Sequence, residues 1–287
     1  MIATLLAGLS TGAVYALVAF GYNLTWLTTR ALNFAQGAFM VAGMFLTITM
    51  YERGVPFPAA LVVLAVAGAL VAAVELVLAV RPVLSKDGHG ELVTTLGVTI
   101  MIQGVILLLV AEDVRQVPFF GPEGLIDVPG GRVAPAELIL IGVTVAIGLL
   151  AHLYTRRSRA GLAAMALSED REAAMVLGVN TARFSFVTFM ASGALGFVVA
   201  PFVGPKTFAI AGLALLLAIK GFVALAVGGL GSQIGALIGG LGVGVVEALV
   251  VRGLGADWQN ASVFVLFVLV MTLRPRGLFG EVKERTV

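Results

Sequence analysis

The sequence contains no cysteine and few charged residues. Without cysteine, the chain cannot form disulfides, thiolate metal sites or a cysteine nucleophile, which excludes a disulfide-stapled extracellular scaffold. Charged residues make up only 12% of the 287 positions, whereas apolar residues make up 60% and the mean hydropathy is +1.07. A soluble domain cannot bury that much apolar surface, so the composition predicts a polytopic membrane protein.

Several chemical motifs are also missing. No lysine directly follows a glycine, so the sequence lacks the Gly-Lys pair of a P-loop and is not expected to bind nucleotide phosphates in that way. The two histidines, His89 and His152, stand apart from each other and near loops, which argues against a metal site. Because no nucleophile, base and orienting acid converge in the sequence, an intramembrane enzyme is not predicted.

A helix that spans a bilayer needs roughly 20 consecutive, mainly apolar residues. Apolar windows of about this length cover 4–26, 34–50, 57–80, 92–111, 137–154, 184–204, 208–228, 233–251 and 259–273. They predict an all-α fold, a polytopic transmembrane helical bundle with 8–9 membrane segments forming a single domain over residues 1–287. The first window has no basic residue before Arg30, so we expect a spanning helix there rather than a cleaved signal peptide. The lower number holds if a segment near Asn33 or the glycine-dense stretch 228–244 is re-entrant.

Basic residues concentrate in three connections, which fixes the expected orientation. They are Arg81 and Lys86, then Arg156, Arg157, Arg159, Arg171 and Arg183, and finally Arg274, Arg276, Lys283 and Arg285. Since lysine and arginine are retained in cytoplasmic loops, we predict that the loop at about 156–183 and the C-terminus are cytoplasmic. The proline-rich loop at about 112–136, with Glu112, Asp113, Glu123 and Asp127, is expected outside. These loop residues account for the net charge of +2, so no nucleic acid is expected as a partner, and the apolar windows make the lipid bilayer the expected one.

Charged residues inside the apolar windows need compensation, because insertion scales put a charge at the bilayer centre at about 2.5–3.5 kcal/mol. Lys220 and Glu247 lie in neighbouring windows and are predicted to form an ion pair facing the bundle interior. The pair is either structural or part of the solute pathway, and snorkelling toward an interface is the further alternative. Glu75 lies about two turns from the end of its window and is expected to reach that boundary.

Small residues recur at four-residue spacing in the glycine-dense stretch. They are Gly231, Gly235 and Gly239, and again Gly240 and Gly244. This spacing allows helix backbones to approach closely, so we predict helix packing at these positions. A broken helix whose backbone lines a translocation path is the alternative, and both can hold together.

Polar residues next to expected helix breaks are candidates for a solute pathway. They are Asn23, Asn33, Gln36, Thr94, Thr95 and Gln103, together with Lys220 and Glu247. A helix that begins near Asn33 or Thr94 would direct its positive end inward, which suits a carboxylate. Ordinary helix capping and hydrogen bonding between helices is the alternative explanation.

The loop at about 156–183 is long enough to hold its own helix. Ser168 is a suitable N-cap, the acidic side chains of Glu169 and Asp170 favour the positive end of a helix, and Gly178 is suited to end it. We therefore predict a short helix on the membrane surface. Its apolar side chains would contact a partner groove or the membrane.

The stretch Glu172-Ala173-Ala174, followed after three residues by Gly178, resembles the EAA loop of permeases from bacterial ABC importers. In that family the loop is the coupling helix that docks into an ATPase subunit. The resemblance implies that coupling to an ATPase involves Asp170, Glu172, Ala173, Ala174 and Gly178.

A wider resemblance, to branched-chain amino-acid permeases of the LivH type, covers nearly the whole chain. The matching stretches are 12–21, Asn33-Phe34-Ala35-Gln36-Gly37, 94–97, 220–222, 228–232, Gly235-Ala236 and the tail 273–280. Gln36 departs from the family's usual histidine in Asn-Phe-Ala-His-Gly, and because glutamine does not titrate, a proton-linked role at this position is in doubt.

The resemblance implies an ATP-driven importer built from two permease subunits, two cytoplasmic ATPases and an external solute-binding protein. ATP and Mg would be held by the partner ATPases, with no cofactor in this chain. Branched-chain or other hydrophobic amino acids are the expected solutes, and urea or short amides are the alternative within the family. An ion-coupled secondary transporter also stays open, although it would have no need of an EAA-type loop.

Overall fold

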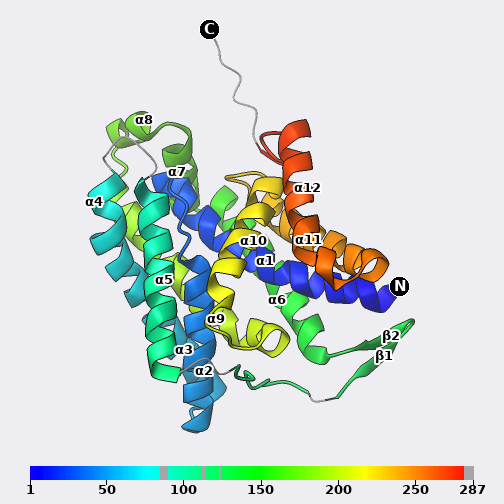
Figure 1. The fold of residues 1–287 in the computed structure, drawn as a ribbon. Helices are drawn as coiled ribbons and strands as arrows, with labels where there is room; N and C mark the ends of the chain where they lie inside the picture. Colours follow the sequence, from blue (N-terminus) through cyan, green and yellow to red (C-terminus); the bar gives the residue numbers. More distant parts are fainter. Residues whose placement is uncertain (85–89, 111–113, 123, 281–287) are drawn as a thin grey trace.

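The computed structural model describes residues 1–84, 90–110, 114–122 and 124–280, which form a helical bundle with one β-hairpin (Figure 1). The helices are α1 (Ile2–Thr29), α2 (Gln36–Glu52), α3 (Phe57–Glu75), α4 (Arg81–Leu84), α5 (Gly90–Val110), α6 (Pro135–Arg157), α7 (Arg159–Glu169), α8 (Arg171–Val176), α9 (Thr181–Thr207), α10 (Leu213–Gly228), α11 (Gln233–Leu254) and α12 (Gln259–Leu273). A π-helical segment, Leu76–Val80, joins α3 to α4, and a 3₁₀ turn, Ala256–Trp258, precedes α12.

Each of the nine apolar windows contains one of these helices. Seven described helical segments are long and apolar enough to cross a membrane: Ile2–Thr29, Phe57–Leu84, Gly90–Val110, Pro135–Arg157, Thr181–Thr207, Gln233–Leu254 and Ala256–Leu273. The helices α2 and α10 are shorter, with 17 and 16 residues. The prediction of a multi-pass helical bundle is thus confirmed, while a total of eight or nine segments depends on these two shorter helices.

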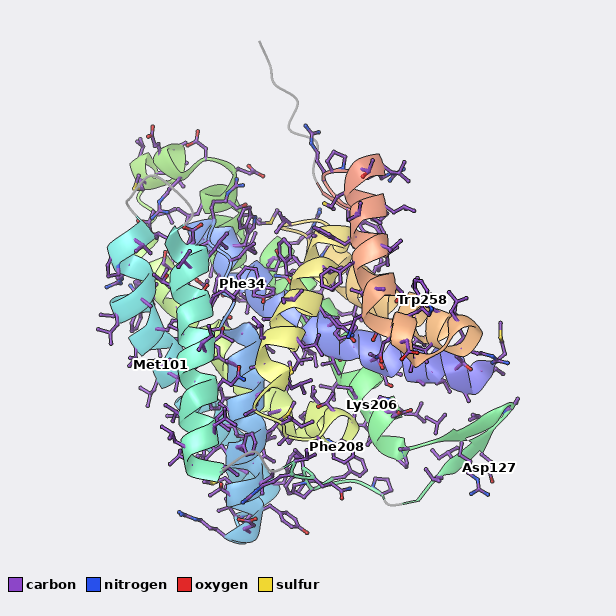
Figure 2. The ribbon with its side chains drawn as sticks, viewed as in Figure 1. Phe34, Met101, Asp127, Lys206, Phe208 and Trp258 are labelled. Carbon is purple, nitrogen blue, oxygen red and sulfur yellow. The ribbon has the colours of Figure 1, made fainter. Side chains whose placement is uncertain are left out.

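The outer surface of the bundle is apolar. Large apolar side chains are exposed along three helices: Val66 and Leu70 on α3, Met101 and Leu108 on α5, and Val265 and Leu269 on α12. Figure 2 shows Met101 pointing outward from α5. Such a surface would be unstable in water, whereas lipid tails solvate it.

Helix α1 runs through the middle of the bundle, surrounded by α6, α9, α10 and α11 (Figure 1). Glycines allow α11 to lie directly against it. A Cβ atom added to Gly240 would lie 2.5 Å from the backbone nitrogen of Ala16, and one added to Gly244 would lie 2.2 Å from the backbone nitrogen of Gly12. On its other side α11 meets α10, where a Cβ on Gly235 would lie 2.5 Å from the carbonyl oxygen of Gly228, and Gly239 is similarly close. These backbones can approach so closely only where side chains are absent.

Gly231 does not pack between helices, so its predicted role is wrong. It lies in the turn between the end of α10 and the start of α11, with φ at +88°. No described atom lies within 4 Å of the place where its Cβ would be. Its backbone N–H donates a hydrogen bond to Asn23 Oδ1 at 2.8 Å. A left-handed conformation is the reason for glycine here, and the turn interrupts the glycine-dense stretch.

The two ends of the bundle differ. Helices α4, α7 and α8 and the C-terminal end of α12 gather at one end, whereas the hairpin lies at the other side, near the N-terminus (Figure 1). The hairpin pairs β1 (Ile126–Val128) with β2 (Gly131–Val133) in antiparallel register, and Arg132 contacts Asp127 at 3.1 Å. This short hairpin is an addition to the predicted all-α fold, and Gly130 and Gly131 adopt positive φ, which permits its tight turn. Lys86, His89, Glu112, Asp113, Glu123, Lys283 and Arg285 lie outside the described residues.

Candidate functional site

Lys220 and Glu247 form the predicted ion pair inside the bundle. Lys220 Nζ, on α10, lies 2.8 Å from Glu247 Oε1, on α11, and both side chains are buried. Tyr15 of α1 joins them, donating its hydroxyl to Glu247 Oε2 at 2.8 Å and accepting from Lys220 Nζ at 3.1 Å. Gln259, at the start of α12, donates to Glu247 Oε1. The pair therefore extends into a network over four helices, which we call the Lys220 network.

The charges of Lys220 and Glu247 are compensated within the Lys220 network. Both oxygens of Glu247 accept hydrogen bonds, and the Tyr15 hydroxyl acts as donor and acceptor at once. A buried charge pair is stable only when such additional bonds complete its geometry. This arrangement favours the structural alternative over direct solute contact, and sequence reasoning missed Tyr15 and Gln259. The sequence could have indicated Tyr15, because its hydroxyl is a polar group within the apolar window 4–26 and needs a partner there.

Glu75 is buried inside the bundle and accepts a hydrogen bond from Asn33, whereas the sequence suggested a side chain that extends to the membrane boundary. It is 3% exposed, at the end of α3, where the helix changes to the π-helical segment Leu76–Val80. Asn33 Nδ2, from the connection between α1 and α2, donates to Glu75 Oε2 at 2.7 Å, while Asn33 Oδ1 accepts from Ala35 N at 2.9 Å. Glu75 Oε1 has no hydrogen-bond partner in the described part of the chain. Asn33 thus ties the entry of α2 to a carboxylate that retains acceptor capacity.

Gln36 connects α2 to α9 through a reciprocal contact with Ser192. Its Nε2 donates to the Ser192 carbonyl at 3.1 Å, and the Ser192 hydroxyl donates to Gln36 Oε1 at 2.7 Å. Gln36 is fully buried, and the absence of a side chain at Gly21 of α1 leaves room for its amide. A glutamine fits here because one side chain must both donate and accept.

The threonines of α5 contribute differently from the prediction. Thr94 and Thr95 both hydrogen-bond to the carbonyl of Glu91 in their own helix, since α5 begins at Gly90 rather than near Thr94. One turn further, Thr99 lies 3.0 Å from the Phe34 carbonyl, beside Asn33. Among the described hydrogen bonds, none joins the Gln103 side chain to these residues. We refer to Asn33, Gln36, Glu75, Thr99 and Ser192 as the Asn33 cluster.

The loop between α6 and α9 contains two helices instead of the one predicted. Ser168 lies within α7 and donates to the Met165 carbonyl, so its assignment as N-cap is wrong. Asp170 is the N-cap of α8, and its Oδ1 accepts from the backbone N–H groups of Glu172 and Ala173, both at 3.0 Å. An aspartate satisfies free N–H groups and the positive helix end together, which gives it this position.

The short helix α8 presents apolar side chains to the outside. Ala174 is buried, whereas Val176 and Leu177 are 88% and 82% exposed and Met175 is also exposed. Gly178 follows with φ at +89° and ends the helix, as the sequence predicts. The exposed side chains form a small apolar surface on α8, which lies at one end of the bundle (Figure 1).

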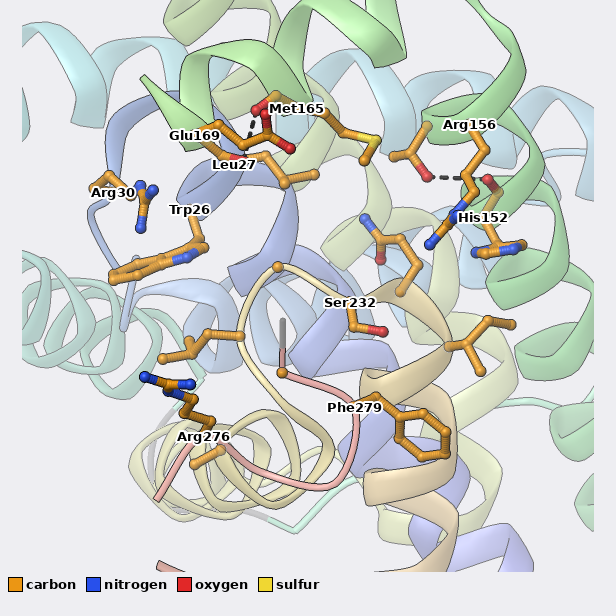
Figure 3. A pocket seen from close by; sticks show the side chains of 18 of the residues that line it. Trp26, Leu27, Arg30, His152, Arg156, Met165, Glu169, Ser232, Arg276 and Phe279 are labelled. Carbon is orange, nitrogen blue, oxygen red and sulfur yellow. Dashed lines mark hydrogen bonds between the residues drawn. The ribbon is translucent and has the colours of Figure 1, made fainter. Parts of the chain in front are cut away.

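A cavity of about 1070 Å³ opens on the same end of the bundle (Figure 3). The ends of α1 and α6, part of α7, the start of α11 and the segment after α12 enclose it. Figure 3 shows His152 and Arg156 on one wall and Arg30 and Arg276 on the other. Within the described chain, none of the pathway candidates lines this cavity. The described residues also contain no group of three His, Asp or Glu side chains that could hold a metal ion.

Seven described apolar helices, one of them the largely buried central helix α1, define a multi-pass membrane protein. The chain belongs to the family of the branched-chain amino acid transport system permease component, which it matches over residues 4–273, and the resemblance predicted from its motifs is thereby confirmed.

Similar proteins cover nearly its full length. The high-affinity branched-chain amino acid transport system permease protein BraD of Pseudomonas aeruginosa is 29% identical over 96% of this chain and 95% of its own length. LivH of Escherichia coli is 28% identical over 96% and 94%. The solved structure of PsaBC from Streptococcus pneumoniae in complex with Fab shares the fold, with a TM-score of 0.50 at 12% identity, over 95% of this chain and 92% of that one.

Proposed function

We propose that this chain is the membrane-spanning permease subunit of an ATP-driven importer for branched-chain or other hydrophobic amino acids. The observation that carries the proposal is the exposed helix α8, with its Asp170 cap and the apolar side chains of Val176 and Leu177 facing outward. An amphipathic helix with such a face suits a groove on a partner protein. The family and the names of the similar proteins support the solute class.

The proposed partners are a second permease subunit of the same family, two ATPase subunits and an external solute-binding protein. The ATPases would bind ATP and Mg and dock on α8, with Asp170, Glu172, Ala173, Ala174 and Gly178 forming the coupling segment. In this arrangement α2, α10 or both also cross the membrane, which gives 8–9 segments. The end that carries α7, α8 and the C-terminal end of α12 then faces the cytoplasm, since it holds most of the described arginines.

The pathway candidates divide into two groups. Lys220 and Glu247 neutralise each other in a completed network, and Thr94 and Thr95 bond within their own helix. Asn33 and Gln36 are stronger candidates, because they border the break between α1 and α2 and because Glu75 beside them has one unpartnered oxygen. The ammonium group of an amino acid could donate a hydrogen bond to this free carboxylate oxygen.

A targeted change of α8 tests the proposal. Val176→Asp together with Leu177→Asp places two charges on the surface that would dock the ATPases, so we expect loss of ATPase co-purification and of leucine uptake. Leu254→Asp is the matched control, since Leu254 is an exposed leucine at the end of α11. Undiminished co-purification and uptake in the double variant would refute the assignment of α8. Uptake that follows an ion gradient and survives the changes would indicate a secondary transporter, and uptake of urea or acetamide instead of leucine would indicate the other solute class.

A further inference from the structure

The cavity beside α7, which we call the basic cavity, contains a buried amide without partners. Gln233, the first residue of α11, lines this cavity and is 3% exposed. In the described part of the chain, neither its Nε2 nor its Oε1 has a hydrogen-bond partner. Buried polar groups are almost always paired in folded proteins, because an unmade hydrogen bond is costly. The side-chain nitrogen and oxygen of Gln233 both lack partners at the wall of a cavity, which indicates that a bound ligand supplies the missing hydrogen bonds.

The cavity also carries an excess of positive charge, because three arginines and one acidic residue, Glu169, line it. Arg30, Arg156 and Arg276 line it from α1, α6 and the segment after α12 (Figure 3). No ion pair joins any of these arginines to an acidic side chain among the residues that the structure describes. The N-terminus of α11 adds its positive end at Gln233, where Ser232 Oγ already accepts from the backbone N–H of Gly235. Guanidinium groups and a helix N-terminus together favour a carboxylate.

Part of the remaining wall is apolar. Trp26 and Leu27 from α1, Met271 from α12 and Phe279 from the following segment line the same space. A small ligand that suits both parts carries a carboxylate and an aliphatic group, and the volume of about 1070 Å³ exceeds the need of one such molecule. An aliphatic amino acid has this chemistry, and it is the solute of the proposed function.

We propose that the basic cavity is a regulatory site that binds the carboxylate of an aliphatic amino acid from the face that carries α7 and α8. This inference rests on the proposed function. The cavity joins α11 to α7 through Met165 and Ser168, and α7 continues through the Asp170 cap into α8. A ligand held between α11 and α7 stabilises one placement of the coupling segment, so accumulated solute slows further import.

The test uses the complete transporter in proteoliposomes, with the loaded solute-binding protein outside and ATP inside. Only molecules whose ATPases face the lumen are active, so the lumen contacts the basic cavity. The initial rate of labelled leucine uptake is measured with luminal leucine, with luminal leucinamide, which lacks the carboxylate, and with neither. We expect luminal leucine to reduce the rate severalfold and leucinamide to leave it unchanged.

Two variants locate the effect. Gln233→Met removes the amide at similar length, and Arg156→Gln removes an exposed charge without disturbing the core, so both are expected to abolish the inhibition while uptake persists. Arg159→Gln is the control, because Arg159 is an exposed arginine of the same loop that does not line the cavity. Normal uptake without inhibition by luminal leucine, equal inhibition by leucinamide, or wild-type inhibition in both variants would each overturn the inference and leave the proposed function intact. Absence of leucine uptake from the wild-type complex would instead overturn the proposed function, and the inference with it.

Discussion

Lys220 Nζ lies 2.8 Å from Glu247 Oε1 in the interior of the bundle, and this contact joins α10 to α11 across the glycine turn that separates them. Breaking one side of a buried pair leaves an uncompensated charge and costs about 3–5 kcal/mol. We therefore expect Lys220→Met and Glu247→Gln to reduce the yield of folded protein strongly, as measured by size-exclusion chromatography in detergent.

The double variant Lys220→Met with Glu247→Met distinguishes the roles of the pair. Replacing both charges with apolar groups of similar volume is often neutral for stability. If the pair is structural, the double variant recovers part of the yield and the uptake, because the charge is balanced again although Tyr15 and Gln259 lose their partners. Recovery of folded protein without uptake would show that the charges contact the solute.

Asn33 supports the carboxylate of Glu75, so Asn33→Leu is expected to lower stability. The change leaves both oxygens of Glu75 without a protein donor in the described contacts and also removes the bond to Ala35 N. We expect a loss of about 1–3 kcal/mol, seen as a lower midpoint in thermal unfolding. Leu5→Ala, at the exposed start of α1, is the control. An unchanged midpoint in Asn33→Leu would contradict the contact.

The close approach of α1 and α11 depends on Gly244, whose added Cβ would overlap the backbone of Gly12. Gly244→Ala should force the helices apart and destabilise the protein by about 1–3 kcal/mol. Gly242→Ala is the matched control in the same helix, because no described atom lies within 4 Å of its added Cβ. Thermal unfolding of the two variants gives the comparison, and equal midpoints would refute the packing.

The cap of α8 is Asp170, so Asp170→Ala should loosen the helix by about 1 kcal/mol. Hydrogen exchange of the peptide that covers 171–177 then accelerates roughly fivefold, since local opening follows local stability. Ser168→Ala should leave that exchange rate unchanged, because the Ser168 hydroxyl bonds within α7. The reverse result would restore Ser168 as the cap.

Most of the fold could be predicted from the lengths of the apolar segments, because a membrane-spanning helix requires a run of apolar residues that is visible in a single sequence. Each predicted window contains a helix, and the paired burial of Lys220 and Glu247 followed from the cost of isolated charges. The short hairpin could not be predicted in the same way. Strands of three residues carry little pattern, and the turn depends on Gly130 and Gly131 in a segment rich in glycine and proline.

Contacts between distant segments were harder to predict than helices. Glu75 was expected to reach the membrane boundary because the sequence shows how far it lies from the end of its helix. The sequence does not show that Asn33 lies beside it in space. Ser192 and Thr99 are ordinary polar residues in their windows, and their partners Gln36 and Phe34 lie 156 and 65 positions away. Gln233 became informative only when its burial showed both amide atoms without partners.

The proposed ATP-driven import is tested by the uptake of labelled leucine into proteoliposomes that hold the purified complete complex. We expect uptake that requires luminal ATP and external solute-binding protein together and that disappears when Val176→Asp and Leu177→Asp are combined. Leucine uptake driven by an ion gradient in the absence of ATP, or equal uptake in the double variant, would contradict it.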